Sequence, residues 1–74
     1  MSDRYRNEFV RIGLNNLYYR KQQGITQQKL AEITSYSKNH IQKIETANAS
    51  PSIEALFDIA SALQIPIEKL FERR

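Results

Sequence analysis

Apolar residues recur at helical spacing along most of the chain, and the first such segment runs from Phe9 to Gln23. The segment is made of good helix formers and contains no proline, so it predicts a helix over 9–23. Its apolar positions fit two overlapping stripes, 10/14/17 and 5/9/12/19, and the pattern leaves open which stripe faces inward. Gly24 follows and suits the left-handed conformation that ends many helices.

A second, shorter helix is defined by its capping residues. Thr26 is a predicted N-cap whose hydroxyl accepts from a free backbone N–H of the first turn. Ile25 before the cap and Leu30 four residues after it match a hydrophobic staple. Together with Leu30, Ala31 and Ile33 are expected to form the buried side of this helix.

The same arrangement recurs eleven residues later, which predicts a third helix. Ser37 is its N-cap, and Tyr36 and Ile41 are its staple. Ile41 and Ile44 form its expected buried edge. The two helices are separated only by a sharp turn at 34–36, and this spacing predicts a helix-turn-helix.

The last third of the chain predicts two more helices. Residues 48–51 form a loop by composition, after which Ser52 caps a fourth helix. Pro66 suits the start of a shorter fifth helix that ends at Phe71. The apolar residues of the fourth helix have clean helical spacing; they are Ile53, Leu56, Phe57, Ala60 and Leu63.

These elements predict an all-α domain of five helices. Residues 1–8 are expected to form a flexible N-terminal extension or an added helix turn, and residues 9–74 the folded domain. The chain has 74 residues, no cysteine and one histidine, so a disulfide, a thiolate metal site and a cofactor are not expected. No catalytic set of side chains is visible either, and the chain is not expected to be an enzyme.

Charge and hydropathy narrow the range of partners. The net charge is +3, with basic residues in excess over 1–50 and acidic residues in slight excess over 51–74. The first two-thirds of the chain is therefore suited to a polyanion such as DNA. No apolar run approaches the ~20 residues of a membrane span, so no membrane contact and a cytoplasmic location are expected.

The predicted third helix has an unusual outer surface that mixes amides and cations with almost no acid. Lysine can donate to guanine O6 and N7, and asparagine can pair with adenine N6 and N7 in the major groove. The expected base-contacting residues of this recognition helix, 38–46, are Lys38, Asn39, Gln42 and Lys43.

These residues occur within a longer string that is similar to a known family. The string resembles the phage-repressor family, the Cro-like or XRE-type helix-turn-helix domain of bacterial and phage transcription regulators. The resemblance covers residues 12–71 and implies a lambda-repressor-like fold. The residues that carry it are Gly24-Ile25-Thr26-Gln27, Leu30-Ala31, Ser37, Ile41, Ile44-Glu45, Pro51-Ser52 and Ile59-Ala60.

The resemblance also implies roles for individual side chains. Arg20 is expected to form an ion pair with Glu45 that ties the first helix to the third. The lone histidine is assigned to the surface or to a phosphate contact rather than to a metal. The expected phosphate-contacting residues are Gln27, Ser37, His40, Thr46 and Asn48.

Several positions depart from the family pattern. Ser35 and Ala47 stand where relatives commonly have glycine, and Asn48 is expected to take the left-handed conformation in place of Ala47. Tyr36 replaces a smaller aliphatic residue, and its hydroxyl has the reach to contact a phosphate. Asn16 stands where the first helix usually has an apolar residue.

The resemblance implies a homodimer that binds double-stranded DNA, most simply as a repressor on a palindromic operator. The candidate dimer surface comprises Ile65, Ile67, Leu70 and Phe71, and a competing surface comprises Tyr5 and Phe9. The alternative function is an antitoxin or adaptor of the same fold, whose main surface meets an unidentified protein partner.

Overall fold

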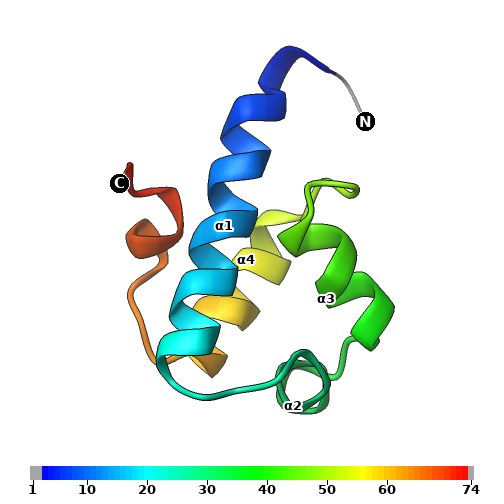
Figure 1. The fold of residues 1–74 in the computed structure, drawn as a ribbon, viewed down its shortest axis with the longest axis vertical. Helices are drawn as coiled ribbons and strands as arrows, with labels where there is room; N and C mark the ends of the chain where they lie inside the picture. The colour runs from blue at the N-terminus through cyan, green and yellow to red at the C-terminus, as the bar shows by residue number, and fades with distance from the viewer. Residues whose placement is uncertain (1–2, 74) are drawn as a thin grey trace.

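The computed structural model describes residues 3–73, and every regular element within that range is a helix (Figure 1). The all-α prediction is therefore confirmed. Residues 1–2 of the expected N-terminal extension and Arg74 lie outside the described residues. The elements are the 3₁₀ turn η1 (Asp3–Tyr5), the α-helices α1 (Arg6–Gln22), α2 (Gln27–Thr34), α3 (Lys38–Glu45) and α4 (Ile53–Ala62), and the 3₁₀ helix η2 (Ile67–Phe71).

The predicted fifth α-helix is wrong in type. Residues Ile67–Phe71 form a 3₁₀ helix, and Pro66 precedes it as an N-cap in extended conformation. The backbone N–H of Lys69 donates to the carbonyl of Pro66, three residues earlier, at 3.0 Å. This spacing is that of a 3₁₀ helix, whereas an α-helix has hydrogen bonds between residues four apart. A segment of five residues has little room for α-helical hydrogen bonds, so the tighter helix is favoured.

The three predicted N-caps are confirmed. The hydroxyl oxygens of Thr26, Ser37 and Ser52 each accept a hydrogen bond of 3.0 Å from the backbone N–H three residues later. Gly24 closes α1 with a φ of 71°, as predicted. These contacts fix where α2, α3 and α4 begin.

Helix α1 runs through the middle of the molecule, with α2 and α3 on one side, η2 on the other and α4 behind it (Figure 1). The structure settles which apolar stripe faces inward. Ile12 is buried, and Phe9 and Tyr19 pack against the core beside it. Leu14, by contrast, is 54% exposed, so the 10/14/17 stripe faces outward.

One continuous core joins all four α-helices and η2. Four of its members, Leu30, Ala31, Ile41 and Ile44, were predicted as the buried edges of the second and third helices. The buried side chains are Ile12, Leu30, Ala31, Ile41, Ile44, Leu56, Ile59, Ala60, Leu63 and Leu70.

Two assignments of apolar residues are wrong. Ile33 was expected on the buried side of its helix but is 48% exposed. Ile53 and Phe57, which share the helical spacing of the buried residues of α4, are also exposed, at 62% and 55%. The apolar residues at helical spacing form a stripe on each helix that is wider than the part of the helix surface that neighbouring helices cover. Leu70 was expected at a dimer surface but is fully buried within the single chain.

The C-terminal segment is fastened to α1 by two polar side chains. Asn15 Nδ2 donates to the carbonyls of Leu70 and Glu72 at 2.9 and 2.8 Å. The Tyr19 hydroxyl donates to Glu72 Oε1 at 2.7 Å.

No helix within residues 3–73 is long and apolar enough to cross a membrane.

Three residues other than glycine in the described part of the chain adopt left-handed backbone conformations. Ser35 at the end of α2 has a φ of 64°, Ala47 after α3 has 60°, and Gln64 after α4 has 57°. The expectation that Asn48 replaces Ala47 in this conformation is wrong. Ala47 keeps the backbone shape that suits glycine, and its methyl group is buried.

Candidate nucleic-acid interface

The outer side of α3 carries a compact group of unpaired polar side chains. Lys38, Asn39, Gln42 and Lys43 are all exposed. Because they occupy positions i, i+1, i+4 and i+5, they share one side of the helix, opposite the buried Ile41. Within residues 3–73 none of the four side chains makes a hydrogen bond or ion pair, so their donors and acceptors are available.

The position of α3 is set by a close approach to α1 at Gly13. A Cβ atom at this glycine would lie 2.6 Å from the carbonyl oxygens of both Ile44 and Glu45. Only a residue without a side chain allows the two backbones to come so near. The sequence reasoning missed Gly13, and its only signal was an isolated glycine inside a helical pattern.

A buried ion pair makes a second connection between α1 and α3. Arg20 Nε donates to Glu45 Oε2 at 2.7 Å, and Arg20 Nη2 donates to Glu45 Oε1 at 3.1 Å. The resemblance implied this pair. The remaining Arg20 nitrogen, Nη1, donates to the carbonyl of Ile25 at 2.9 Å, so the guanidinium also holds the start of the helix-turn-helix.

Gln27 extends this connection to α2. Its Nε2 donates to Glu45 Oε1 at 3.0 Å, and the residue is the first of α2. The Glu45 carboxylate therefore joins α1, α2 and α3. In the free protein this hydrogen bond engages the amide nitrogen that the resemblance assigned to a phosphate.

The other expected phosphate-contacting residues lie at the two ends of α3. Ser37 and His40 are at its start, where the ring centroids of His40 and Tyr36 lie 5.2 Å apart. Thr46 and Asn48 are at its end, where Thr46 Oγ1 donates to the carbonyl of Gln42 at 2.9 Å. Asn48 Nδ2 then donates to Thr46 Oγ1 at 2.9 Å.

Tyr36 does not offer its hydroxyl to a phosphate in this structure. The hydroxyl donates to Asp58 Oδ2, which ties the turn between α2 and α3 to α4. This hydrogen bond is the main reason that the pKa of Tyr36 is raised to about 12, with smaller contributions from burial and from the charges of Asp58 and Glu54. The neutral phenol is therefore favoured.

The structure adds one cation that the sequence reasoning missed. Arg6, in the first turn of α1, is exposed and donates from Nη1 to the carbonyl of Ala47 at 3.5 Å. This contact brings its guanidinium to the loop that holds Thr46 and Asn48. The two regions are 41 positions apart in the sequence, so no local pattern could have joined them.

The part of the chain that the structure describes contains no group of three metal-binding side chains. The site is therefore built from hydrogen-bond donors, acceptors and cations alone. Such a surface can bind a polyanion and distinguish the edges of its bases.

Comparison by sequence identifies the family. The sequence model of the helix-turn-helix family HTH_3 matches residues 17–70, which include all of α2, α3 and α4. The chain belongs to the HTH_3 helix-turn-helix family. No curated protein matches it by sequence.

Solved structures share this HTH_3 fold. The restriction-modification controller protein C.AhdI from Aeromonas hydrophila has a TM-score of 0.85 at 23% identity, with 88% of this chain and 98% of that chain covered. An HTH_3 family transcriptional regulator from Vibrio cholerae has a TM-score of 0.83 at 29% identity over 88% of this chain and 36% of that one. The clp gene regulator ClgR from C. glutamicum has a TM-score of 0.81 at 22% identity, with 84% and 80% covered.

Proposed function

We propose that this HTH_3 domain is a sequence-specific double-stranded DNA-binding transcription regulator that acts as a repressor by occupying its operator. The observation that carries the proposal is the outer side of α3. Four side chains there are exposed and unpaired within residues 3–73: Lys38, Asn39, Gln42 and Lys43. On its inner side, α3 is held against α1 by the close approach at Gly13 and by the Arg20–Glu45 ion pair. A rigid helix with free amides and cations suits the major groove.

Phosphate contacts would flank this helix at both ends. We assign Gln27, Ser37 and His40 to the strand near the start of α3, and Thr46 and Asn48 to the strand near its end. Arg6 joins the second group because it already reaches the Ala47 carbonyl. Such contacts set affinity and register, whereas α3 selects the sequence.

The regulator would bind as a two-fold dimer, because paired recognition helices read half-sites about one helical turn apart. Of the expected dimer surface, Leu70 is buried and Phe71 is 43% exposed. Ile53 and Phe57 lie one turn apart on α4 and are more exposed. We therefore place the dimer surface on α4, where Glu54 and Asp58 disfavour contact with DNA.

The test begins with selection of bound oligonucleotides from a random pool, which should return a palindrome. A triple variant, Lys38→Ala with Asn39→Ala and Lys43→Ala, should bind that palindrome at least about 100-fold more weakly, since each bidentate base contact contributes ~1–3 kcal/mol. Circular dichroism should show unchanged helical content. Sedimentation of the wild-type complex should give two chains per palindrome.

The matched control removes two positive charges and one amide from α1, away from its contacts with α3 at Gly13 and Arg20: Arg11→Ala, Lys21→Ala and Gln22→Ala. This variant should keep nearly full affinity. Equal losses in the two triple variants would show that binding depends on net charge alone, and would refute the assignment of α3.

A further inference from the structure

One side of α1 leaves much apolar surface exposed. Its apolar side chains lie at positions 10, 14, 17 and 18, so they line one side of the helix. Leu14 and Tyr18 are 54% and 47% exposed, and Val10 and Leu17 are half-buried. We call this side the outer face of α1, defined by Val10, Arg11, Leu14, Leu17, Tyr18 and Lys21.

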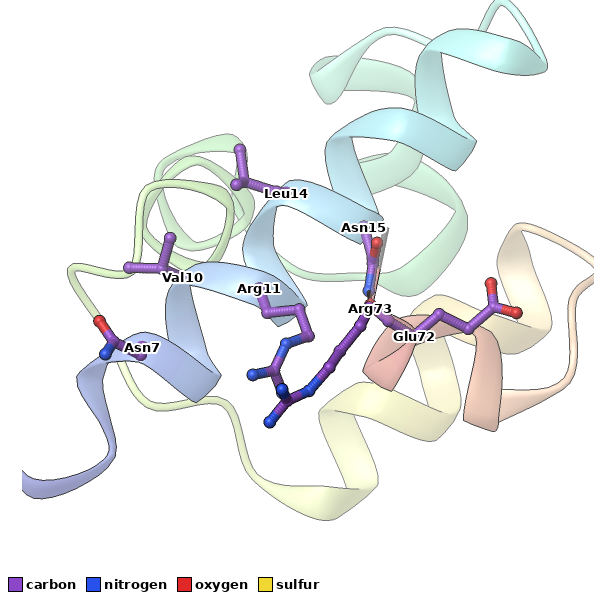
Figure 2. A pocket seen from close by; sticks show the side chains of 7 residues that line it. All are labelled: Asn7, Val10, Arg11, Leu14, Asn15, Glu72 and Arg73. Carbon is purple, nitrogen blue, oxygen red and sulfur yellow. Dashed lines mark hydrogen bonds between the residues drawn. The ribbon is translucent and has the colours of Figure 1, made fainter.

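The outer face is hollowed rather than flat. One hollow of about 440 Å³ lies between α1 and the C-terminal segment, with Val10 and Leu14 in its lining (Figure 2). A second of about 520 Å³ is lined by Leu14, Leu17 and Tyr18. Leu14 lines both hollows, so they are neighbours along the helix, and together we call them the groove of the outer face.

The ionised side chains of the outer face are all positive. Arg11 from α1 and Arg73 from the C-terminal segment line the same hollow (Figure 2). Neither has a carboxylate partner within residues 3–73. Glu72 also lines this hollow, but its carboxylate points away and accepts hydrogen bonds from Tyr19 and Lys69.

We propose that the outer face of α1 docks an acidic amphipathic helix of another protein. Arg11 and Arg73 line one hollow and have no carboxylate partner among the described residues, so a carboxylate of the partner helix placed there would pair with both guanidinium groups. Leu14 and its apolar neighbours would receive leucine-like side chains at helical spacing. Lys21 would attract a second acidic residue toward the other end of the groove.

The charge argues against a second copy of the same face as the occupant. Two outer faces would bring Arg11 and Lys21 against the same residues of the partner copy. The acidic side of α4 could meet this face only in a head-to-tail contact, which does not close into a dimer. Nucleic acid is also a poor occupant, because it would leave the apolar side chains without apolar partners.

The docking surface is separate from the recognition helix. Helix α3 packs against α1 at Gly13 and Arg20, on a different side from Leu14. A protein on the outer face would therefore leave α3 free. The domain could then hold DNA and a second protein at once.

The probe is a fluorescein-labelled helical peptide with leucines at i, i+3, i+4 and i+7 and glutamates elsewhere. Its matched control has lysine in place of every glutamate. Fluorescence anisotropy with the full chain should show saturable binding of the glutamate peptide, at least tenfold tighter than the lysine peptide. Amide chemical shifts should change along α1 and not along α3 or α4.

Three variants locate the contact. Leu14→Ser should weaken binding of the glutamate peptide at least tenfold, and Arg11→Glu with Arg73→Glu should reverse the preference between the two peptides. Ile33→Ser removes a similarly exposed apolar residue from α2 and should leave binding of both peptides unchanged. The proposal is overturned by equal binding of both peptides, by no saturable binding, or by a Leu14→Ser variant that loses self-association instead of peptide binding.

Discussion

On the side of α1 that faces α3, the two helices are held together by a close backbone approach at a glycine and by a buried ion pair. Gly13 admits two backbone carbonyls, and Arg20 holds both carboxylate oxygens of Glu45. On the side that faces η2, the amide of Asn15 and the hydroxyl of Tyr19 reach across to the C-terminal segment. The first contact allows almost no displacement, whereas the second can adjust by side-chain rotation. We therefore expect α3 to be held more rigidly than the C-terminal segment.

The largest effect is expected from breaking the ion pair. Arg20→Met would leave the buried Glu45 carboxylate without its cation, and such losses cost ~3–5 kcal/mol. Chemical denaturation would measure the change in the free energy of unfolding. The double variant Arg20→Met with Glu45→Leu should recover part of the loss, because no unpaired buried charge remains. A double variant less stable than the single one would contradict this account.

A somewhat smaller loss is expected at the glycine contact. Gly13→Ala would force α1 and α3 apart, and overpacking of this kind typically costs ~1–3 kcal/mol. DNA affinity should fall as well, because the end of α3 must move. The matched control is Gly24→Ala, which has open space around it and is disfavoured only by its φ of 71°. If both variants lost the same stability and affinity, the close approach would not be what positions α3.

The smallest effect is expected on the η2 side. Asn15→Ala removes two hydrogen bonds to the carbonyls of Leu70 and Glu72, at a net cost of ~1–2 kcal/mol. Amide hydrogen exchange should accelerate in Ile67–Phe71 while α3 keeps its protection. Faster exchange in α3 would show that the two sides of α1 are coupled, and would weaken the contrast between them.

The sequence was most informative where structure is decided locally. A hydroxyl at Thr26, Ser37 or Ser52 caps the helix that follows it, and this choice depends on residues within one turn. The ion pair of Arg20 with Glu45 was reached only through the resemblance to a family. Periodicity alone could not have joined residues 25 positions apart.

The sequence was least informative where the burial or role of a residue depends on which distant element packs against it. Ile33 and Phe57 have core-like spacing, yet no neighbouring element within the described chain covers them. Gly13 looked like an ordinary helix position because its role depends on carbonyls in α3. The sequence predicts Arg6 only as part of a polar N-terminal extension, whereas in the structure its guanidinium contacts the carbonyl of Ala47.

The left-handed backbone at Ala47 also bears on how such a domain can change over generations. An alanine there costs about 1–2 kcal/mol of backbone strain, while burial of its methyl group returns roughly 0.8 kcal/mol. Burial offsets only part of the strain, so glycine is expected to be more stable than alanine there by roughly 0.2–1.2 kcal/mol, the difference between these values. Every alanine codon becomes a glycine codon by one base change. A single base change at this codon would therefore relieve strain and loosen the backbone just after α3, while every side chain on the outer side of α3 stays the same.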